Sequence, residues 1–333
     1  MVVRYFARRI LFFLLTLWAA VTLNFLIPRL QPGDPADAMV RKLVGQSRQI
    51  DPAQVKAIQA MLGTPNTGLL QQYVDYLKSL LHLDFGVSYT YFPYSVAHMV
   101  GQALWWTVIL VGVTQVIGFV AGTLLGAFAA WRRNSVFDAV VSLGLSFVGT
   151  LPFFWIAMLL LYLFAFQWHV LPSGGGYSET STRQMSWGYV GDILNHSILP
   201  ATAILITAPI GWVMGMRNNM VQTLGEDYTR LALAKGLKPW KVALLYSARN
   251  AILPNVTGFA ISLGGILGGT VFIEGIFNYP GLGRLLFEAV GNRDYPLMQA
   301  LFLFVTVGVL VANLLADMLY GVLDPRVRKG GTA

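Results

Sequence analysis

The stretch LWWTVILVGVTQVIGFVAGTLLGAFAAW, residues 104–131, carries no charged side chain. A helix needs about 20 apolar residues to cross the hydrocarbon part of a bilayer, so this stretch predicts a membrane-spanning helix. Five further apolar stretches lie at residues 10–30, 137–167, 198–216, 252–277 and 297–322. The sequence therefore predicts an all-α integral membrane protein with six transmembrane helices.

The composition of the whole chain supports this prediction. Of the 333 residues, 56% are hydrophobic and only 11% are charged, whereas an ordinary soluble domain is roughly 25% charged. Such a chain is too apolar for a soluble globule and too poor in charge for a disordered protein. It contains no cysteine, which excludes a disulfide framework and a thiolate metal site.

The basic residues indicate how the spans are oriented. With six spans and a cytoplasmic N-terminus, 14 of the 23 Lys and Arg residues fall on inner segments. Cytoplasmic loops of membrane proteins are enriched in Lys and Arg, so both termini are expected in the cytoplasm. The net charge of +8 is distributed among these loops rather than on one face, and it predicts no nucleic-acid partner.

The predicted spans divide the chain into four parts. Residues 1–30 form the cytoplasmic start and an uncleaved first span, because residues 27–29 (Ile-Pro-Arg) are no small-residue cleavage site. Residues 31–101 form an external region with two short helices, one from Asp51 to Gly63 and one beginning at Leu69. Residues 102–323 form the membrane core, and residues 324–333 form a cytoplasmic tail.

The spans contain little that would drive transport or catalysis. Asp138, Glu274 and Asp317 lie near span ends, and the middle of each span lacks the carboxylate or histidine that marks an ion-coupled carrier. The sequence lacks H-E-x-x-H, G-x-S-x-G and Walker A motifs. We expect no catalytic, cofactor-binding or metal-ligating residue in this chain, and we expect the energy for transport to come from elsewhere.

The largest inner loop, residues 217–250, has the pattern of a helical hairpin. Acidic residues precede a helical stretch at residues 228–235, where they favour a helix N-terminus. Gly236-Leu237-Lys238-Pro239 then combines a helix stop with a new helix start, and a second helix is predicted at residues 240–250. The pattern fits either a rigid docking element or an ordinary amphipathic connector.

Several motifs of this chain resemble one family in the same order. The hairpin sequences ALAKGL (232–237) and RNAILP (249–254) resemble the "EAA loop" of binding-protein-dependent ABC importer permeases, although Arg230 stands where that loop has its glutamate. Seven further motifs resemble the oligopeptide/dipeptide/nickel branch of this family, and in particular its B-type subunit. They are LQPGDP (30–35), LDFGVS (83–88), LGEDYTR (224–230), EGIF (274–277), PGLG (280–283), NRDYP (292–296) and YGVLDPR (320–326).

This resemblance implies a type I ABC importer permease fold and a set of partners. The chain would form half of a heterodimeric pore in a bacterial or archaeal cytoplasmic membrane, with a second homologous permease subunit. Two ATPase subunits, or one fused ATPase, would bind ATP and magnesium, and an extracytoplasmic protein would deliver substrate. The residues expected at the ATPase contact are Asp227, Tyr228, Arg230, Ala234, Lys235, Gly236, Leu237 and Lys238.

The resemblance leaves the substrate open. Relatives import di- or oligopeptides, and the alternatives are cello-oligosaccharides, nickel or glutathione. A stand-alone secondary carrier and a membrane enzyme are the competing classes of protein. Tryptophans such as Trp105 and Trp106 would stack on sugar rings or, as is more common, lie at the bilayer surface. We therefore assign no residue to the substrate path from the sequence.

Overall fold

The computed structural model describes residues 2–30, 68–178, 186–263 and 271–323. Within these ranges the chain is almost entirely helical, and its one β-type pairing is an isolated bridge between Val87 and Ser95. The first predicted external helix, from Asp51 to Gly63, lies outside the described residues. The second is confirmed as α4, Leu69–Leu81.

Four continuous helical stretches are long and apolar enough to cross a membrane. They are α1 (Val2–Arg29), α5 (Val96–Trp131), α8 with α9 (Trp187–Thr207 and Pro209–Leu224), and α15 (Tyr295–Leu323). Each contains one of the predicted spans, and α5 begins several residues before the predicted apolar stretch because Ser95 caps it through the backbone N–H of His98. The all-helical membrane fold is therefore confirmed.

The predicted span at residues 137–167 is bent in the structure. Helix α6 (Val136–Thr150) is followed by α7 (Phe153–Leu160) and a π-helix, η1 (Leu161–Gln167), at an angle of 94°. The break falls at Leu151-Pro152, where Leu151 takes an extended conformation with ψ 134°. A proline lacks the N–H for a helical bond and disfavours helix at the preceding residue, which explains the bend.

The predicted span at residues 252–277 is seen only in part. Helix α12 (Arg249–Ser262) covers its first half and α13 (Val271–Ile276) its end, while residues 264–270 lie outside the described ranges. With the bent pair counted as one span, the described residues contain five candidate spans. The count of six transmembrane helices therefore stays a prediction.

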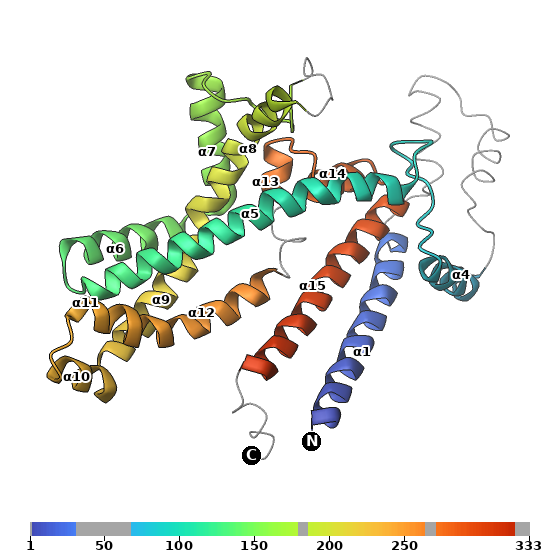
Figure 1. Cartoon of the computed structure of the whole chain (residues 1–333). Helices are drawn as coiled ribbons and strands as arrows, with labels where there is room; N and C mark the ends of the chain where they lie inside the picture. The colour runs from blue at the N-terminus through green and yellow to red at the C-terminus, as the bar shows by residue number, and fades with distance from the viewer. Residues whose placement is uncertain (1, 31–67, 179–185, 264–270, 324–333) are drawn as a thin grey trace.

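Helices α5 and α9 cross closely because two glycines of α5 face α9. A Cβ atom at Gly126 would lie 2.3 Å from the carbonyl oxygen of Val213, and one at Gly122 would lie 2.9 Å from the Cβ of Trp212. Small residues at spacing four let helix backbones approach in membranes, where dispersion and hydrogen bonds replace the hydrophobic effect. This crossing joins the two longest spans of the core (Figure 1).

Helices α1 and α15 run side by side at the other edge of the molecule (Figure 1). Helix α4 packs on α1 through Phe25 and Tyr73, whose ring centroids lie 5.1 Å apart, and the hydroxyl groups of Thr22 and Tyr73 are 2.7 Å apart. The first residues of α1 and the last of α15 lie at the same end of this pair. An even number of spans would bring these described ends of α1 and α15 to one side, as they are here.

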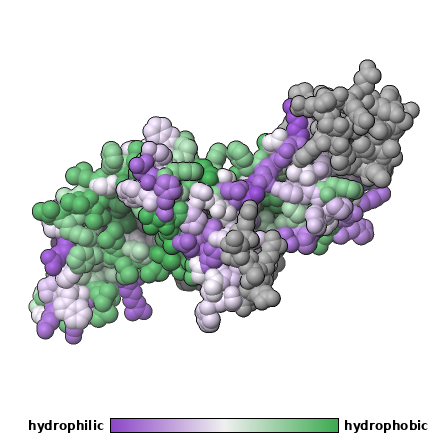
Figure 2. Space-filling model, turned by 90° about the horizontal axis from the view of Figure 1, so that it is seen from above, coloured by the Kyte–Doolittle hydropathy of each residue, from purple (hydrophilic) through white to green (hydrophobic). Residues whose placement is uncertain are grey.

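Large apolar side chains cover much of the outer surface. Leu124 on α5 and Leu143 and Phe147 on α6 are each about two-thirds or more exposed. Figure 2 shows this hydrophobic surface extending over the part of the molecule that contains α5, α6 and α9. A monomeric soluble protein rarely exposes so large an apolar area, so this surface is suited to contact with lipid or with other spans.

Candidate functional site

The predicted hairpin forms at one extremity of the molecule (Figure 1). Its first arm is α10 (Asp227–Ala234), and its second arm consists of α11 (Pro239–Lys241) and the π-helix η2 (Val242–Ala248), which continues into α12. We call residues 226–248 the coupling hairpin. Both arms and the turn agree with the ranges that the sequence predicts, apart from the π-helical winding of the second arm.

The turn of the hairpin is a Schellman motif closed by Gly236. The backbone N–H of Leu237 donates to the carbonyl of Ala232 at 3.3 Å, and that of Gly236 donates to Leu233 at 2.9 Å. Gly236 has φ +80°, a left-handed conformation that costs most other residues roughly 1–2 kcal/mol. The predicted helix stop at Gly236 is therefore confirmed, and Pro239 then starts the second arm at its first helical position.

Buried hydroxyl groups tie the hairpin to the end of α9. Thr229 is fully buried, and its Oγ1 lies 2.9 Å from the carbonyl oxygen of Leu224 and 2.6 Å from that of Glu226. On the second arm, the fully buried Ser247 has its Oγ 2.9 Å from Thr223 Oγ1. Each hydroxyl contacts the carboxyl end of α9, so both arms are fixed to the same span.

Two amides and an apolar cluster complete this attachment. Asn250 donates to the hydroxyl of Tyr228 at 3.2 Å, and Asn219 on α9 donates to the carbonyl of Ala251 at 3.3 Å. The buried apolar residues beneath the hairpin come from α5, α9, η2 and α12 and are Ala130, Met216, Met220, Ala243 and Ala251. Because side chains in such a cluster are closely packed, a displacement of the hairpin would be transmitted to these helices.

The eight predicted contact residues lie mostly on the exposed surface of the hairpin, which we call its free side. Seven of them are exposed, and the exception, Leu237, is half-buried. Sequence reasoning missed the exposed apolar residues between them, which belong to both arms and are Leu231, Leu233, Trp240, Leu244 and Leu245. The sequence contains a signal for this surface, because a short hairpin with this many leucines and a tryptophan has more large apolar side chains than its buried face can hold.

An ion pair lies close to the base of the hairpin. Asp138, at the start of α6, is almost fully buried and accepts hydrogen bonds from Arg217 on α9, with Nε–Oδ1 2.5 Å and Nη2–Oδ2 2.8 Å. Asp138 also accepts from the backbone N–H of Asn134 at 3.1 Å. A bidentate pair is directional, so it fixes the turn between α5 and α6 against the span that leads into the hairpin.

Two buried carboxylates away from the hairpin accept hydrogen bonds from loop and backbone groups. Asp294 is fully buried before α15 and accepts hydrogen bonds from Ser88 Oγ at 2.5 Å and from the backbone N–H groups of Thr90 at 2.7 Å and Leu297 at 3.2 Å. Glu274 is also fully buried and accepts from the backbone N–H of Gly283 at 2.6 Å, near the start of α14 (Leu282–Gly291). These carboxylates hold loops against helices.

The described residues contain no group of three or more His, Asp or Glu side chains with the geometry of a metal site. His82, His98, His169 and His196 are all described, and each stands apart from the coupling hairpin. The chemistry that the hairpin offers is recognition: exposed apolar side chains bordered by Arg230, Lys235, Lys238 and Lys241. Such a surface suits a protein partner whose groove carries complementary acidic groups.

Known proteins show similarity over nearly the whole chain. The model of the family "Binding-protein-dependent transport system inner membrane component" matches residues 122–329. A putative peptide permease protein of Brucella suis biovar 1 is 34% identical over 98% of this chain and 99% of its own length. The dipeptide transport system permease protein DppB of Escherichia coli K12 is 34% identical, covering 92% and 93%. The oligopeptide transport system permease protein AppB of Bacillus subtilis 168 is 31% identical, covering 97% and 98%.

The family match includes the bent span, the Asp138–Arg217 pair and the whole coupling hairpin, and the full-length relatives extend the similarity to α1 and to residues 31–101. Together with the apolar helices, this similarity identifies the chain as a multi-pass membrane protein. The chain belongs to the family of inner membrane components of binding-protein-dependent transport systems.

Proposed function

We propose that this chain is one permease subunit of an ATP-driven importer for di- and oligopeptides, paired with a second homologous permease subunit. The names of the relatives DppB and AppB support peptides as the substrate class. The coupling hairpin carries the proposal structurally, because its exposed apolar and basic residues form a surface that this chain leaves uncovered. We assign that surface to two ATPase subunits or one fused ATPase.

The proposed mechanism divides the work between this chain and its partners. ATP and magnesium bind in the ATPase subunits, and this chain supplies the attachment that transmits their movement. A displacement of the docked hairpin reaches α9 through Thr229 and Ser247 and reaches α6 through the Asp138–Arg217 pair. Alternating access then follows from rigid-body movement of spans against each other, so no carboxylate is needed in the middle of the membrane.

The proposed orientation places the coupling hairpin and both termini in the cytoplasm. The described start of α1 and the end of α15 lie on the lower side of the molecule, as the hairpin does (Figure 1). The hairpin carries several of the Lys and Arg residues that favour a cytoplasmic position. The segment before α5 and the turn between α14 and α15 then face the extracytoplasmic side, where a substrate-binding protein would deliver its cargo.

Co-purification combined with transport tests this function. We expect a tagged chain expressed in its native cells to co-purify with a second permease and ATPase subunits. The reconstituted complex should import radiolabelled di- and tripeptides only with ATP and the binding protein. Import without ATP would indicate a secondary carrier, and turnover of substrate by the isolated chain would indicate an enzyme. Preferential uptake of cello-oligosaccharides, nickel or glutathione would contradict the peptide assignment.

A further inference from the structure

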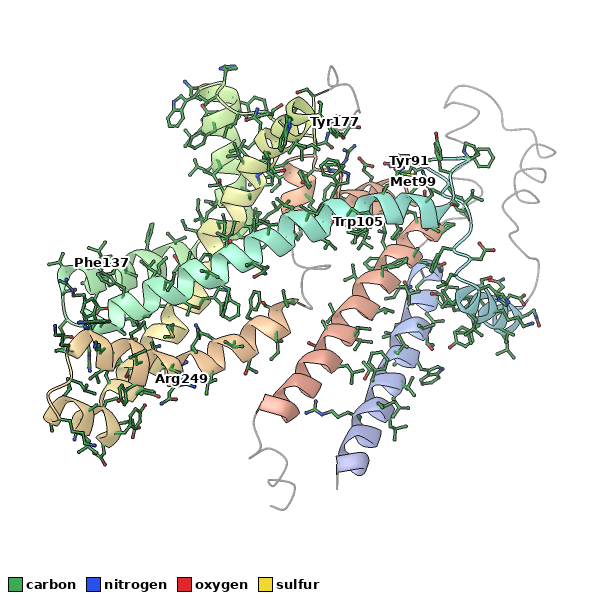
Figure 3. The ribbon with its side chains drawn as sticks, in the orientation of Figure 1. Tyr91, Met99, Trp105, Phe137, Tyr177 and Arg249 are labelled. Atoms are coloured by element: carbon green, nitrogen blue, oxygen red, sulfur yellow. The ribbon has the colours of Figure 1, made fainter. Side chains whose placement is uncertain are left out.

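A cavity opens beside the first turns of α5, at the end of the molecule away from the coupling hairpin (Figure 3). Its volume is about 520 Å³, within the range of small-molecule sites in proteins. We call this cavity the outer pocket. Its lining combines aromatic side chains with one basic and one acidic group, and the residues used below are Tyr91, Trp105, Trp106, Tyr177, Arg284 and Glu288.

The two charged residues of the outer pocket lie one helical turn apart on α14. Arg284 Nε donates to Glu288 Oε1 at 2.8 Å, and about a third of each side chain is exposed. Arg284 also donates to the carbonyl of Asn278 at 3.2 Å, and the hydroxyl of Tyr91 donates to Glu288 Oε2. Burial, reinforced by the neighbouring Glu288, raises the pKa of Tyr91, so its hydroxyl remains a donor at physiological pH.

These contacts use only part of the hydrogen-bonding capacity of the pair. A guanidinium has five N–H donors and a carboxylate has about four acceptor positions. Arg284 uses two donors and Glu288 accepts two hydrogen bonds within the described part of the chain. A positive and a negative group that are partly buried in one pocket thus retain capacity toward a ligand that itself carries both charges.

The pair offers one site for each end of a short peptide. Arg284 and Glu288 contact each other, with Nε–Oε1 2.8 Å, so a bound peptide would keep this ion pair and use the remaining N–H groups of Arg284 for its carboxylate and the remaining acceptor positions of Glu288 for its ammonium. Two extended residues span roughly 7 Å, which is long enough for one molecule to reach both adjacent groups. A neutral oligosaccharide would offer neither charge.

Aromatic rings form the walls around the charged pair. Trp106 and Tyr177 stack with ring centroids 6.2 Å apart, and Tyr177 lies 5.7 Å from Tyr189 on α8. Trp105 is about two-thirds exposed, and Met99 also lines the pocket (Figure 3). Aromatic faces and a flexible methionine accept apolar groups of different shapes. This chemistry suits a ligand with constant termini and variable side chains.

We propose that the outer pocket is a transient binding site for zwitterionic di- and tripeptides. Arg284 binds the peptide carboxylate, Glu288 binds the ammonium group, and the aromatic walls contact the side chains. This inference rests on the proposed peptide import and adds the site that receives the peptide from the binding protein. The charged pair selects for free termini in the membrane subunit itself, independently of the selectivity of the binding protein.

Photo-cross-linking to the assembled transporter tests the site. The complex of both permeases and the ATPase subunits is placed in lipid nanodiscs without binding protein. It is irradiated in the presence of p-benzoylphenylalanyl-alanine, a dipeptide with free termini whose first side chain carries the photoreactive benzophenone. We expect the label on residues 91–106, above all on Met99, because that segment lines the pocket. Excess dialanine should remove the label, whereas N-acetyl-dialanine amide, which lacks both terminal charges, should not.

Two variants and a matched control make the result specific. Arg284→Gln and Glu288→Gln should each lower labelling about tenfold or more, since hydrogen bonds to charged groups contribute strongly to binding. Arg293→Gln changes an exposed arginine in the turn between α14 and α15 that does not line the pocket, and it should label like the wild type. Co-purification of the ATPase subunits identifies variants that fail to assemble, and Glu288→Gln, which retains an acceptor for Tyr91, is the milder change.

The outcomes separate this inference from the proposed function. If the wild-type complex imports peptides but the label lies elsewhere, or the acetylated amide competes as well as dialanine, the outer pocket is not the peptide site while the function stands. If the wild-type complex does not import peptides, the proposed function fails, and the inference fails with it. Labelling of the pocket that only a cello-oligosaccharide removes would also overturn the inference.

Discussion

The coupling hairpin and the segment around Asp294 lie at opposite ends of the molecule. They differ in how far their side chains are buried and paired within the chain. The hairpin buries Thr229 and Ser247 against α9 but leaves Leu231, Leu244 and other large apolar residues exposed. Around Asp294, the loop hydroxyl and backbone groups that reach the carboxylate are buried or half-buried within the chain. Within the described residues, the hairpin thus leaves large apolar side chains uncovered, whereas the polar groups around Asp294 are paired and buried.

This difference indicates where the effects of mutations should fall. Changes on the free side of the hairpin should impair transport while leaving the stability of the chain nearly unchanged. Changes at the buried Asp294 cluster should lower stability first and transport only as a consequence. Transport and thermal stability of the purified complex, measured on the same variants, therefore test the comparison directly.

The largest effect is expected for Gly236→Val. Valine is strained at φ +80° and would disrupt the Schellman turn that sets the angle between α10 and the second arm. We expect peptide uptake and substrate-stimulated ATPase activity to fall at least tenfold, with normal insertion into the membrane. Gly291→Val, at an exposed glycine with open space around it, is the matched control and should retain uptake. Uptake by Gly236→Val at the control level would contradict the role of the hairpin.

A smaller and different effect is expected for Asp294→Asn. The substitution removes the charge and one acceptor oxygen from a fully buried group that receives three hydrogen bonds, and such bonds contribute about 1.5–3 kcal/mol each. We expect the melting temperature of the purified complex to fall while the assembled fraction still transports. Asp84→Asn, in the segment before α5 but exposed, should leave the melting temperature unchanged. Equal melting temperatures of the two variants would show that the Asp294 cluster is not a stabilising element.

The smallest effect is expected for Tyr228→Phe. This change removes a hydroxyl that accepts one hydrogen bond from Asn250 at 3.2 Å on an exposed surface, and it keeps the ring available for the partner. We expect uptake within about twofold of the wild type and an unchanged melting temperature, because one exposed hydrogen bond contributes little. Tyr228→Ala, which removes the ring as well, should reduce uptake more strongly. If Phe and Ala reduced uptake equally, the hydroxyl rather than the ring would be the important group.

Local sequence signals predicted the local structures of this protein. The run from Ala232 to Pro239 contains a helix stop, a glycine and a proline, and the structure forms the predicted turn with Gly236 at positive φ. The apolar stretches predicted the long helices in the same manner. The bend at Leu151-Pro152 differs from the predicted continuous span, because the apolar composition of residues 137–167 indicates a single helix although Pro152 is a local signal for a break.

Contacts between segments far apart in the chain could not be predicted from the sequence. Asp138 and Arg217 are 79 residues apart, and Ser88 and Asp294 are 206 residues apart. Nothing local to either residue specifies its partner, since the pairing depends on how the spans cross. For the same reason the outer pocket, which joins α5, α14 and the loop at Tyr177, followed only from the arrangement of these elements.

The accessibility of position 234 in the assembled complex tests the central claim, that the free side of the coupling hairpin is covered by an ATPase subunit. The chain contains no cysteine, so Ala234→Cys and, at the opposite end, Tyr94→Cys each introduce a single thiol at an exposed residue. We predict that a maleimide reagent labels the Ala234→Cys variant slowly in the complete complex and rapidly after the ATPase subunits are removed. The Tyr94→Cys variant, the control, should be labelled at the same rate with and without the ATPase subunits. Equal labelling of the Ala234→Cys variant in the two samples would contradict the account.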